Sequence, residues 1–162
     1  MLGTSAASVN SHLQRARARL DEERRAGRLY TPSRPPSDVE QRLLREFLAA
    51  WDAVDLGRLE VLFADTVVLT MPPLPTRIEG RQAVGQFFAT VPADGQLDRI
   101  ELVQIRANTA PAVAAYLRDE NGIARAYGIM VLTFDGDRIR EVTGFTDPDV
   151  FAAFGLPAER GG

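Results

Sequence analysis

The stretch from Asp98 to Thr146 restricts the fold more than any other part of the chain. Four segments rich in β-branched and apolar residues alternate there with three turn signals, which are Asn108-Thr109-Ala110-Pro111, Asn121-Gly122 and Asp135-Gly136. The Asn-Gly and Asp-Gly pairs are favoured in two-residue β-hairpins. Strands joined by such short turns pair antiparallel with their sequence neighbours, so the segment predicts a four-stranded antiparallel meander.

Helical signals dominate the part of the chain before the meander. Ser37 is a good N-cap for a helix that continues to about Ala53, and a second helix follows Asp55. Residues 65–71 are apolar and β-branched and predict a strand, and a third helix follows Gly80. A short closing helix after the meander completes the order of elements of an α+β fold.

Two-residue turns fix the register of the strands that they join, so the pairing can be calculated. Tyr116 is then opposite Tyr127, and Met130 is opposite Glu141. One face of the meander becomes almost entirely apolar and is expected to pack against the helices, with Glu141 and Thr143 as its only polar members. The other face carries the two tyrosines and is open to water or to a second subunit, which predicts a homodimer through Tyr116 and Tyr127. A β-bulge would move this assignment by one residue and exchange the faces.

Small residues lie in the middle of the apolar face. Ala115, Ala126 and Gly128 would leave space beneath larger side chains from the helices and the early strand, and a curved sheet of this kind can enclose an apolar pocket. The alternative is that the small residues only allow the helices to pack closely against the sheet. The residues themselves leave both interpretations open.

The first 36 residues differ in charge from the rest of the chain. They carry seven Arg and three acidic residues, whereas residues 37–162 carry twelve Arg and nineteen acidic residues. Three prolines within residues 29–37 exclude a helix and predict an extended linker. Before the linker, a helix over about residues 6–25 has one narrow apolar stripe, which is too little to stabilise an isolated helix. A basic segment joined to an acidic domain suggests two parts with different partners.

Composition excludes several kinds of site. The chain has no Cys and one His, His12, so we expect no disulfide framework, no thiol nucleophile and no metal site built from Cys or from two His. No phosphate-cradling glycine motif is present, and neither a metal nor a cofactor is predicted. No apolar run approaches the roughly 20 residues of a membrane-spanning helix, and no secretory signal is recognisable. A cytoplasmic protein without membrane contact is therefore expected.

The N-terminal segment resembles the end of region 4 of an extracytoplasmic-function (ECF) sigma factor. The resemblance lies in Leu2-Gly3-Thr4-Ser5 and in the following run from Val9-Asn10-Ser11 to Leu13-Gln14-Arg15-Ala16-Arg17. In that family Leu-Gly is the turn of a helix-turn-helix and the next helix reads the promoter, so residues 1–28 would be the remnant of a recognition helix. The resemblance implies contacts with base edges and phosphates in the full-length protein. The residues concerned are Ser8, Asn10, Ser11, Gln14, Arg15, Arg17 and Arg19.

Residues 38–157 resemble the SnoaL-like domain of the nuclear transport factor 2 (NTF2) superfamily. The resemblance lies in Thr70-Met71-Pro72-Pro73-Leu74-Pro75, in Glu79-Gly80-Arg81 and in Phe145-Thr146-Asp147-Pro148. It implies a cone-shaped, curved antiparallel sheet wrapped round three helices, here preceded by an isolated N-terminal helix and followed by a tail at residues 158–162. It also implies an apolar pocket, whose expected lining is Trp51, Phe63, Met71, Phe87, Leu117, Met130, Thr143 and Phe145.

Together the two resemblances imply the C-terminal regulatory domain of an alternative RNA polymerase sigma factor. Region 2 and the first helices of region 4 are not in the chain, so we expect a C-terminal piece that does not initiate transcription alone. The implied partners are the RNA polymerase core and promoter DNA in the full-length protein, together with a small apolar ligand. The domain would modulate initiation through intramolecular or polymerase contacts.

Two alternatives remain open at this point. The superfamily includes cyclases and isomerases, so the chain could be a stand-alone enzyme of that type with Glu141 as acid or base, because a carboxyl group against apolar walls suits proton transfer. Glu141 at an open rim, or paired with an Arg, would not serve this role. The other alternative is a ligand-binding or dimerisation module without chemistry. We expect that the chain is not an enzyme.

Overall fold

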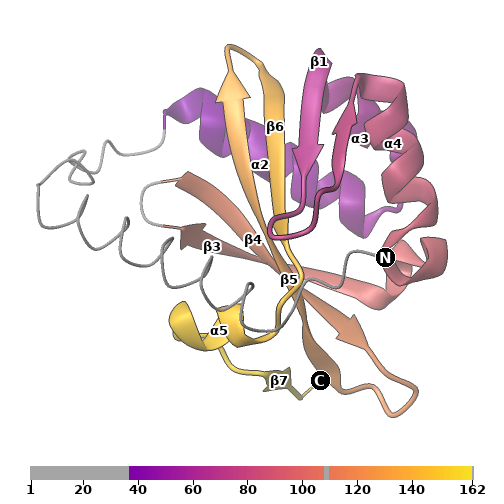
Figure 1. Ribbon diagram of the computed structural model, residues 1–162, viewed down its shortest axis with the longest axis vertical. Coiled ribbons are helices and arrows are strands. Elements are labelled where there is room, and N and C mark those ends of the chain that lie inside the picture. The colour runs from indigo at the N-terminus through magenta and orange to yellow at the C-terminus, as the bar shows by residue number, and fades with distance from the viewer. Residues whose placement is uncertain (1–36, 108–109, 162) are drawn as a thin grey trace, which may run out of the picture. The chain divides into compact units, whose positions relative to one another are not determined.

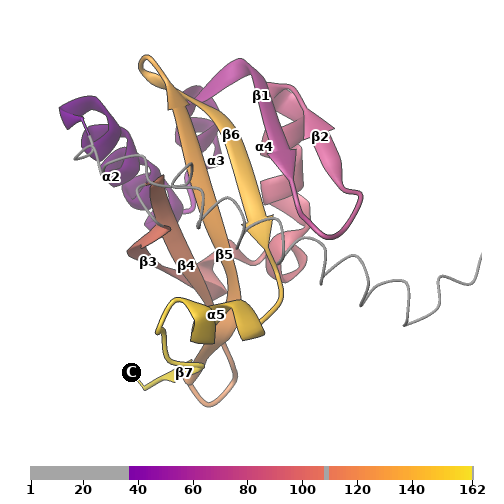
Figure 2. The ribbon, with the colours of Figure 1, turned by 60° about the vertical axis from the view of Figure 1, so that its left-hand side comes forward.

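Residues 37–107 and 110–161 are described by the computed structural model, in which a curved, unclosed seven-stranded sheet bends round three helices (Figures 1 and 2). These helices are α2 (Asp38–Asp52), α3 (Leu56–Leu62) and α4 (Arg81–Thr90), and a further short helix, α5 (Asp149–Ala153), packs on the outer face of the sheet. The strands are β1 (Phe63–Thr70), β2 (Arg77–Glu79), β3 (Ile100–Ala107), β4 (Ala110–Arg118), β5 (Ala124–Asp135), β6 (Arg138–Phe145) and β7 (Glu159–Arg160). Two 3-10 turns, η1 (Pro92–Gly95) and η2 (Leu97–Arg99), connect α4 to β3.

The strand order is β2-β1-β6-β5-β4-β3, with β7 paired to β5. Strands β3 to β6 form the antiparallel meander that the turn signals predict. Strand β1 extends the sheet by pairing parallel with β6, and β2 then pairs antiparallel with β1. The sequence does not predict β2, and it assigns residues 158–162 to a tail, whereas Glu159 and Arg160 form β7 in the sheet.

Local capping explains where the first two helices begin. Ser37 Oγ accepts a hydrogen bond from the backbone N–H of Glu40 at 3.2 Å, and Glu40 Oε2 accepts one from the Ser37 N–H at 2.7 Å. This reciprocal pair satisfies N–H groups that have no partner inside α2. Asp55 Oδ1 accepts from the Arg58 N–H at 3.0 Å and caps α3 in the same way. Both caps are at the residues that the sequence predicts.

The main core fills the space between the inner face of the sheet and helices α2, α3 and α4. Phe47, Trp51, Phe63 and Phe88 are each at most 2% exposed. Phe88 lies edge-on to Trp51, with ring centroids 5.7 Å apart, and stacks on Phe63 at 5.9 Å. This aromatic cluster joins α2, β1 and α4. Two of its members, Trp51 and Phe88, also line a cavity beneath the sheet.

A second, smaller core lies between the outer face of the sheet and α5. Figure 2 shows α5 on the side of the sheet opposite α3 and α4. Tyr116 and Phe151 meet there edge to face at 5.2 Å, and each is 1% exposed. The Tyr116 hydroxyl donates to the carbonyl oxygen of Pro157 at 3.1 Å. The C-terminal segment therefore covers part of the outer face.

The register predicted for the β4–β5 hairpin is correct far from the turn and wrong near it. Ala115 pairs with Gly128 as calculated, but Tyr116 pairs with Ala126, so Tyr127 is an extra residue in β5. This bulge turns Tyr127 to the inner face, where it packs against the main core. Tyr116 and Tyr127 consequently lie on opposite faces, and the predicted dimer surface made of both residues is wrong.

A second bulge displaces the predicted pairing of β5 with β6. Asp135 pairs with Arg138, which moves the turn by one residue, and the pairing shifts again between Ile139 and Glu141. Val142 is 1% exposed and lies on the inner face, whereas the sequence assigns this face to Glu141 and Thr143 on either side of it. Because side chains alternate along a strand, Glu141 and Thr143 belong to the other face.

Candidate ligand-binding site

An apolar cavity of about 80 Å³ lies between the inner face of the sheet and the helices. From the helical side it is lined by the C-terminal end of α2 and by α4 with the turn that follows it, and from the other side by β1, β4, β5, β6 and the start of β3. The lining residues are Trp51, Leu69, Met71, Phe87, Phe88, Val91, Pro92, Ile100, Ala115, Tyr127, Gly128, Ile129, Met130, Val142, Gly144, Phe145 and Thr146.

Two glycines line the cavity and have different structural roles. A Cβ atom on Gly128 would lie 2.9 Å from the Phe145 carbonyl oxygen, so the neighbouring strand can approach only a glycine there. A Cβ atom on Gly144 would make only ordinary contacts, with the nearest at 3.6 Å to the Met71 side chain. Gly128 is therefore required by strand packing, whereas Gly144 leaves space that the cavity uses.

The cavity wall carries few polar side-chain groups. Trp51 donates its indole N–H to the Ile100 carbonyl oxygen at 3.0 Å, and Tyr127 Oη accepts from the Ala93 N–H at 3.1 Å. Thr146 is exposed at the end of β6. Among the described lining residues, none is Asp, Glu, His, Lys or Arg. Since an unpaired charge is costly to bury, these walls suit a neutral apolar molecule.

The structure brings five of the eight predicted pocket residues to this cavity, namely Trp51, Met71, Phe87, Met130 and Phe145. The other three do not line it. Phe63 is fully buried behind Phe88, with which it stacks. Leu117 lies towards the β4–β5 turn, opposite Arg125, and Thr143 follows the outward alternation of β6.

Glu141, the candidate acid or base, does not line the cavity. In the sheet it is the backbone partner of Thr133 in β5 and of Val68 in β1. The next residue along β6, Val142, is buried and points inward. The predicted contact with Met130 is wrong, because Met130 pairs with Gly144. The turn, which is displaced by one residue, and the bulge before Glu141 together produce the difference.

Tyr127 is one of the lining residues that the sequence places on the wrong face of the sheet. Its hydroxyl reaches Ala93 in the turn after α4, where Ala93 and Asp94 both have positive φ angles, of 48° and 55°. Alternation along the strand assigns Tyr127 to the outer face, and the sequence carries no signal for the bulge that reverses it. The expectation about small residues holds at two of three positions, because Ala115 and Gly128 line the cavity while Ala126 packs in the outer cluster.

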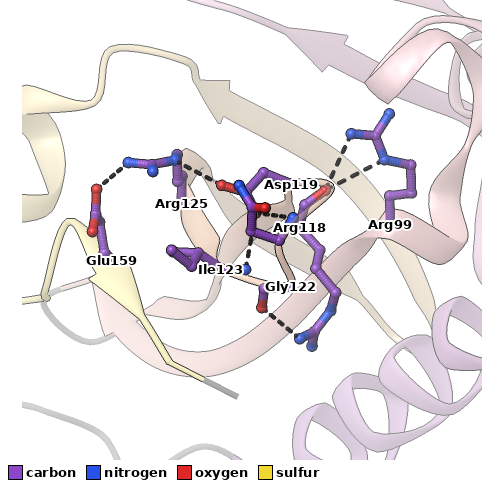
Figure 3. Close-up of polar contacts among 8 residues, drawn as sticks. Arg99, Arg118, Asp119, Gly122, Ile123, Arg125 and Glu159 are labelled. Atoms are coloured by element: carbon purple, nitrogen blue, oxygen red, sulfur yellow. Dashed lines mark hydrogen bonds and ion pairs between the residues drawn. The ribbon is translucent and has the colours of Figure 1, made fainter.

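A separate polar network lies at the tip of the β4–β5 hairpin, shown in Figure 3. Arg125 pairs with Asp119 at 3.3 Å and with Glu159 of β7. Asp119 Oδ1 also accepts from the N–H groups of Asn121 and Ile123, at 2.9 and 3.0 Å. Loss of water around Asp119 opposes ionisation, but these two amides and the Arg125 guanidinium outweigh it, so the pKa of Asp119 lies below its ordinary value.

Beneath this network, burial raises the pKa of Tyr116 above its ordinary value. The Arg160 guanidinium, 5.4 Å from the ring centroid, opposes the increase, and the Glu101 carboxylate adds to it. Glu101 is itself paired with Arg118 at 3.0 Å and with Arg160 at 3.5 Å. The network therefore anchors β7 to the hairpin and contributes no group to the cavity.

The remaining predicted sites either lie outside the residues that the structure describes or are not found among them. The DNA-contacting residues expected between Ser8 and Arg19, the recognition-helix remnant expected over residues 1–28, and all of the linker expected over residues 29–37 except Ser37 lie outside the described residues. Within the described part of the chain, no group of three or more Asp, Glu, His or Cys side chains is placed to hold a metal ion. No helix in the same part is long and apolar enough to cross a membrane.

Comparison with known families identifies the domain. The model of the SnoaL-like domain matches residues 44–142, which is more than half of the chain and runs from Leu44 in α2 to Val142 in β6. The chain belongs to the SnoaL-like domain family. The lining residues from Trp51 to Val142 lie within the matched part of this SnoaL-like domain, and Gly144, Phe145 and Thr146 follow it.

The chain is also similar to the ECF RNA polymerase sigma factor SigG of Mycobacterium tuberculosis, found in two strains. The two are 36% identical over 159 residues, a match that covers 96% of this chain and 42% of the sigma factor. The chain thus spans less than half the length of the curated relative that it matches.

Solved structures show the same fold at low sequence identity. An NTF2-like protein of unknown function from Mesorhizobium loti has a TM-score of 0.54 at 20% identity, with coverage of 70% of this chain and 97% of that one. The protein RV0760c from Mycobacterium tuberculosis, in complex with estradiol-17beta-hemisuccinate, has a TM-score of 0.51 at 17% identity, with coverage of 68% and 95%. At these identities the likeness concerns the fold.

Proposed function

We propose that the chain is the C-terminal part of an ECF-type sigma factor, and that its SnoaL-like domain is a non-catalytic regulatory domain that responds to a small apolar ligand. In the full-length protein its partners would be the RNA polymerase core and promoter DNA. The domain would act on transcription initiation through contacts with other sigma regions or with polymerase.

The observation that carries this proposal is the extent of the sigma-factor match. Residues 37–162 make up less than four fifths of the chain, so a match over 96% of it must extend into the basic segment before Ser37. A match confined to the SnoaL-like domain would indicate only a shared fold. Similarity across both parts supports an architecture in which this domain follows a promoter-reading segment.

The cavity supports the regulatory, non-enzymatic part of the proposal. Its described lining carries no carboxylate, imidazole, amine or guanidinium, and Glu141 lies elsewhere. Binding an apolar molecule needs only shape and buried area, which the cavity supplies. A linker would hold the domain close to the promoter-reading segment, so that weak contacts occur at high effective concentration.

A domain exchange tests the proposal. The part of SigG matched by this chain is replaced with the chain itself, and transcription from a promoter read by that sigma factor is measured with purified core polymerase. We expect the hybrid to initiate transcription, and deletion of residues 37–162 from the hybrid to change the yield. Failure of the hybrid to bind core polymerase would contradict the sigma-factor assignment.

A second pair of hybrids separates the cavity from the rest of the domain. Gly144→Val fills cavity space, whereas Val61→Leu changes a side chain that is 59% exposed on α3. We expect Gly144→Val to change the transcript yield in the same direction as deletion of residues 37–162 does. We expect Val61→Leu to leave the yield unchanged. Equal transcription from the two variants and the parent hybrid would show that the cavity has no regulatory role.

A further inference from the structure

One hydroxyl group, that of the cavity-lining residue Tyr127, has hydrogen-bonding capacity that the described residues do not use. Tyr127 Oη accepts a hydrogen bond from the Ala93 N–H at 3.1 Å, and this is its only hydrogen bond with a described residue. A phenolic hydroxyl can accept and donate at once. The Tyr127 proton is therefore available to a further acceptor, and the bond from Ala93 strengthens it as a donor because neighbouring hydrogen bonds polarise one another.

The other polar side chains of the wall do not compete for this role. The indole N–H of Trp51 is already donated to the Ile100 carbonyl oxygen. Thr146 is exposed to water at the end of β6, whereas Tyr127 packs against the main core. Its bond to Ala93 places the Tyr127 hydroxyl beside Val91 and Pro92, which line the cavity.

We propose that the cavity selects a neutral, apolar molecule that carries one hydrogen-bond-accepting oxygen, such as a ketone, and that the Tyr127 hydroxyl donates to this oxygen. The inference rests on the proposed ligand-binding function and adds the chemical class of the ligand. A charged ligand is disfavoured because the described lining residues offer no counter-charge. A pure hydrocarbon would bind without using the Tyr127 proton.

A matched pair of probes tests the class of ligand. Acetophenone and α-methylstyrene have nearly the same shape and differ in that a carbonyl oxygen replaces a methylene carbon. Binding of each to the full chain is measured by calorimetry. We expect the wild-type chain to bind acetophenone with a dissociation constant roughly fivefold lower than that for α-methylstyrene. This ratio corresponds to the net free energy of one hydrogen bond.

Two variants assign the preference to one hydroxyl. Tyr127→Phe removes the proton donor from the cavity, and we expect it to abolish the preference while α-methylstyrene still binds. Tyr116→Phe is the matched control, because the Tyr116 hydroxyl bonds to Pro157 on the opposite face of the sheet. It should keep the full preference.

The carbonyl stretching frequency of bound acetophenone gives an independent reading. A hydrogen-bonded carbonyl absorbs at lower frequency than the same carbonyl in hexane, and we expect this shift with the wild-type chain and with Tyr116→Phe but not with Tyr127→Phe. Equal binding of both probes to the wild-type chain, or an unshifted carbonyl, would overturn the inference and leave the apolar cavity function standing. Absence of binding of either probe would instead count against the ligand-binding function itself.

Discussion

Trp51, near the C-terminal end of α2, donates its indole N–H to the carbonyl oxygen of Ile100, the first residue of β3. The bond spans 49 positions of sequence, is buried, and joins the helical layer to the sheet at the cavity wall. Both residues are at most 4% exposed, so water cannot replace either partner. The same side chain also packs against Phe47 and Phe88.

We therefore expect Trp51→Phe to lower the free energy of unfolding by about 2 kcal/mol, because it leaves a buried carbonyl oxygen without its donor. Urea denaturation followed by circular dichroism measures the change, since the variant loses the only Trp of the chain. Val61→Ala, at an exposed position of α3, is the control and should stay within about 0.5 kcal/mol of wild type. Equal stability of Trp51→Phe and wild type would show that the bond to Ile100 contributes nothing.

The two cavity glycines should respond differently to the same substitution. Gly128→Ala places a Cβ atom against the backbone of β6, and we expect a loss of about 1–3 kcal/mol in unfolding free energy. Gly144→Ala meets only ordinary contacts and should be tolerated, while narrowing the cavity. Thermal unfolding of both variants checks the contrast, and a greater loss for Gly144→Ala would refute the strand packing described here.

Asp119 should contribute to stability only while it is ionised. Because the folded state lowers its pKa, the contribution is complete above the ordinary value of 3.8 and is lost as the pH falls through the lower folded-state pKa. We expect Asp119→Ala to unfold at a lower urea concentration than wild type at pH 7, and this difference to shrink below pH 3.8. Glu120→Ala, at the exposed neighbouring position, is the control and should unfold at the same urea concentration as wild type at pH 7.

Tyr116 should ionise later in the folded chain than in the unfolded chain. Burial raises its pKa above the ordinary value of 10.0, so the stability that it contributes is present below that pH and is lost as the pH rises through the folded-state pKa. Absorbance titration of the tyrosines should show a step above pH 10 that moves down in concentrated urea and is missing in Tyr116→Phe. A titration curve identical in shape for the variant and wild type would contradict the assignment.

Much of the fold follows from local signals. Ser37 with Glu40, and Asp55, predict the starts of α2 and α3, and the turn residues predict the meander. Each of these signals acts within a few residues, through a side chain that bonds to a nearby backbone group or through a backbone conformation that a turn requires. Among the expected pocket residues, Trp51, Met71 and Phe87 line the cavity and come from segments outside β5 and β6, so their positions do not depend on the register of those two strands.

The faces of β5 and β6 could not be predicted in this way. The bulges at Tyr127 and before Glu141 each insert one residue, and one inserted residue reverses the alternation of every side chain beyond it. No pattern within either strand indicates where these residues enter. The calculated dimer face and the carboxylate inside the sheet both depended on unbroken alternation.

By itself, the sequence determined the type and order of the elements and the apolar character of the core, because caps, turns and helical spacing are local properties. Only the tertiary structure decided that Tyr127 enters the cavity and that Glu141 stays out of it. The reason is that bulges accompany the curvature of a sheet round its helices, and that curvature depends on contacts such as the one between Tyr127 and Ala93, 34 residues apart.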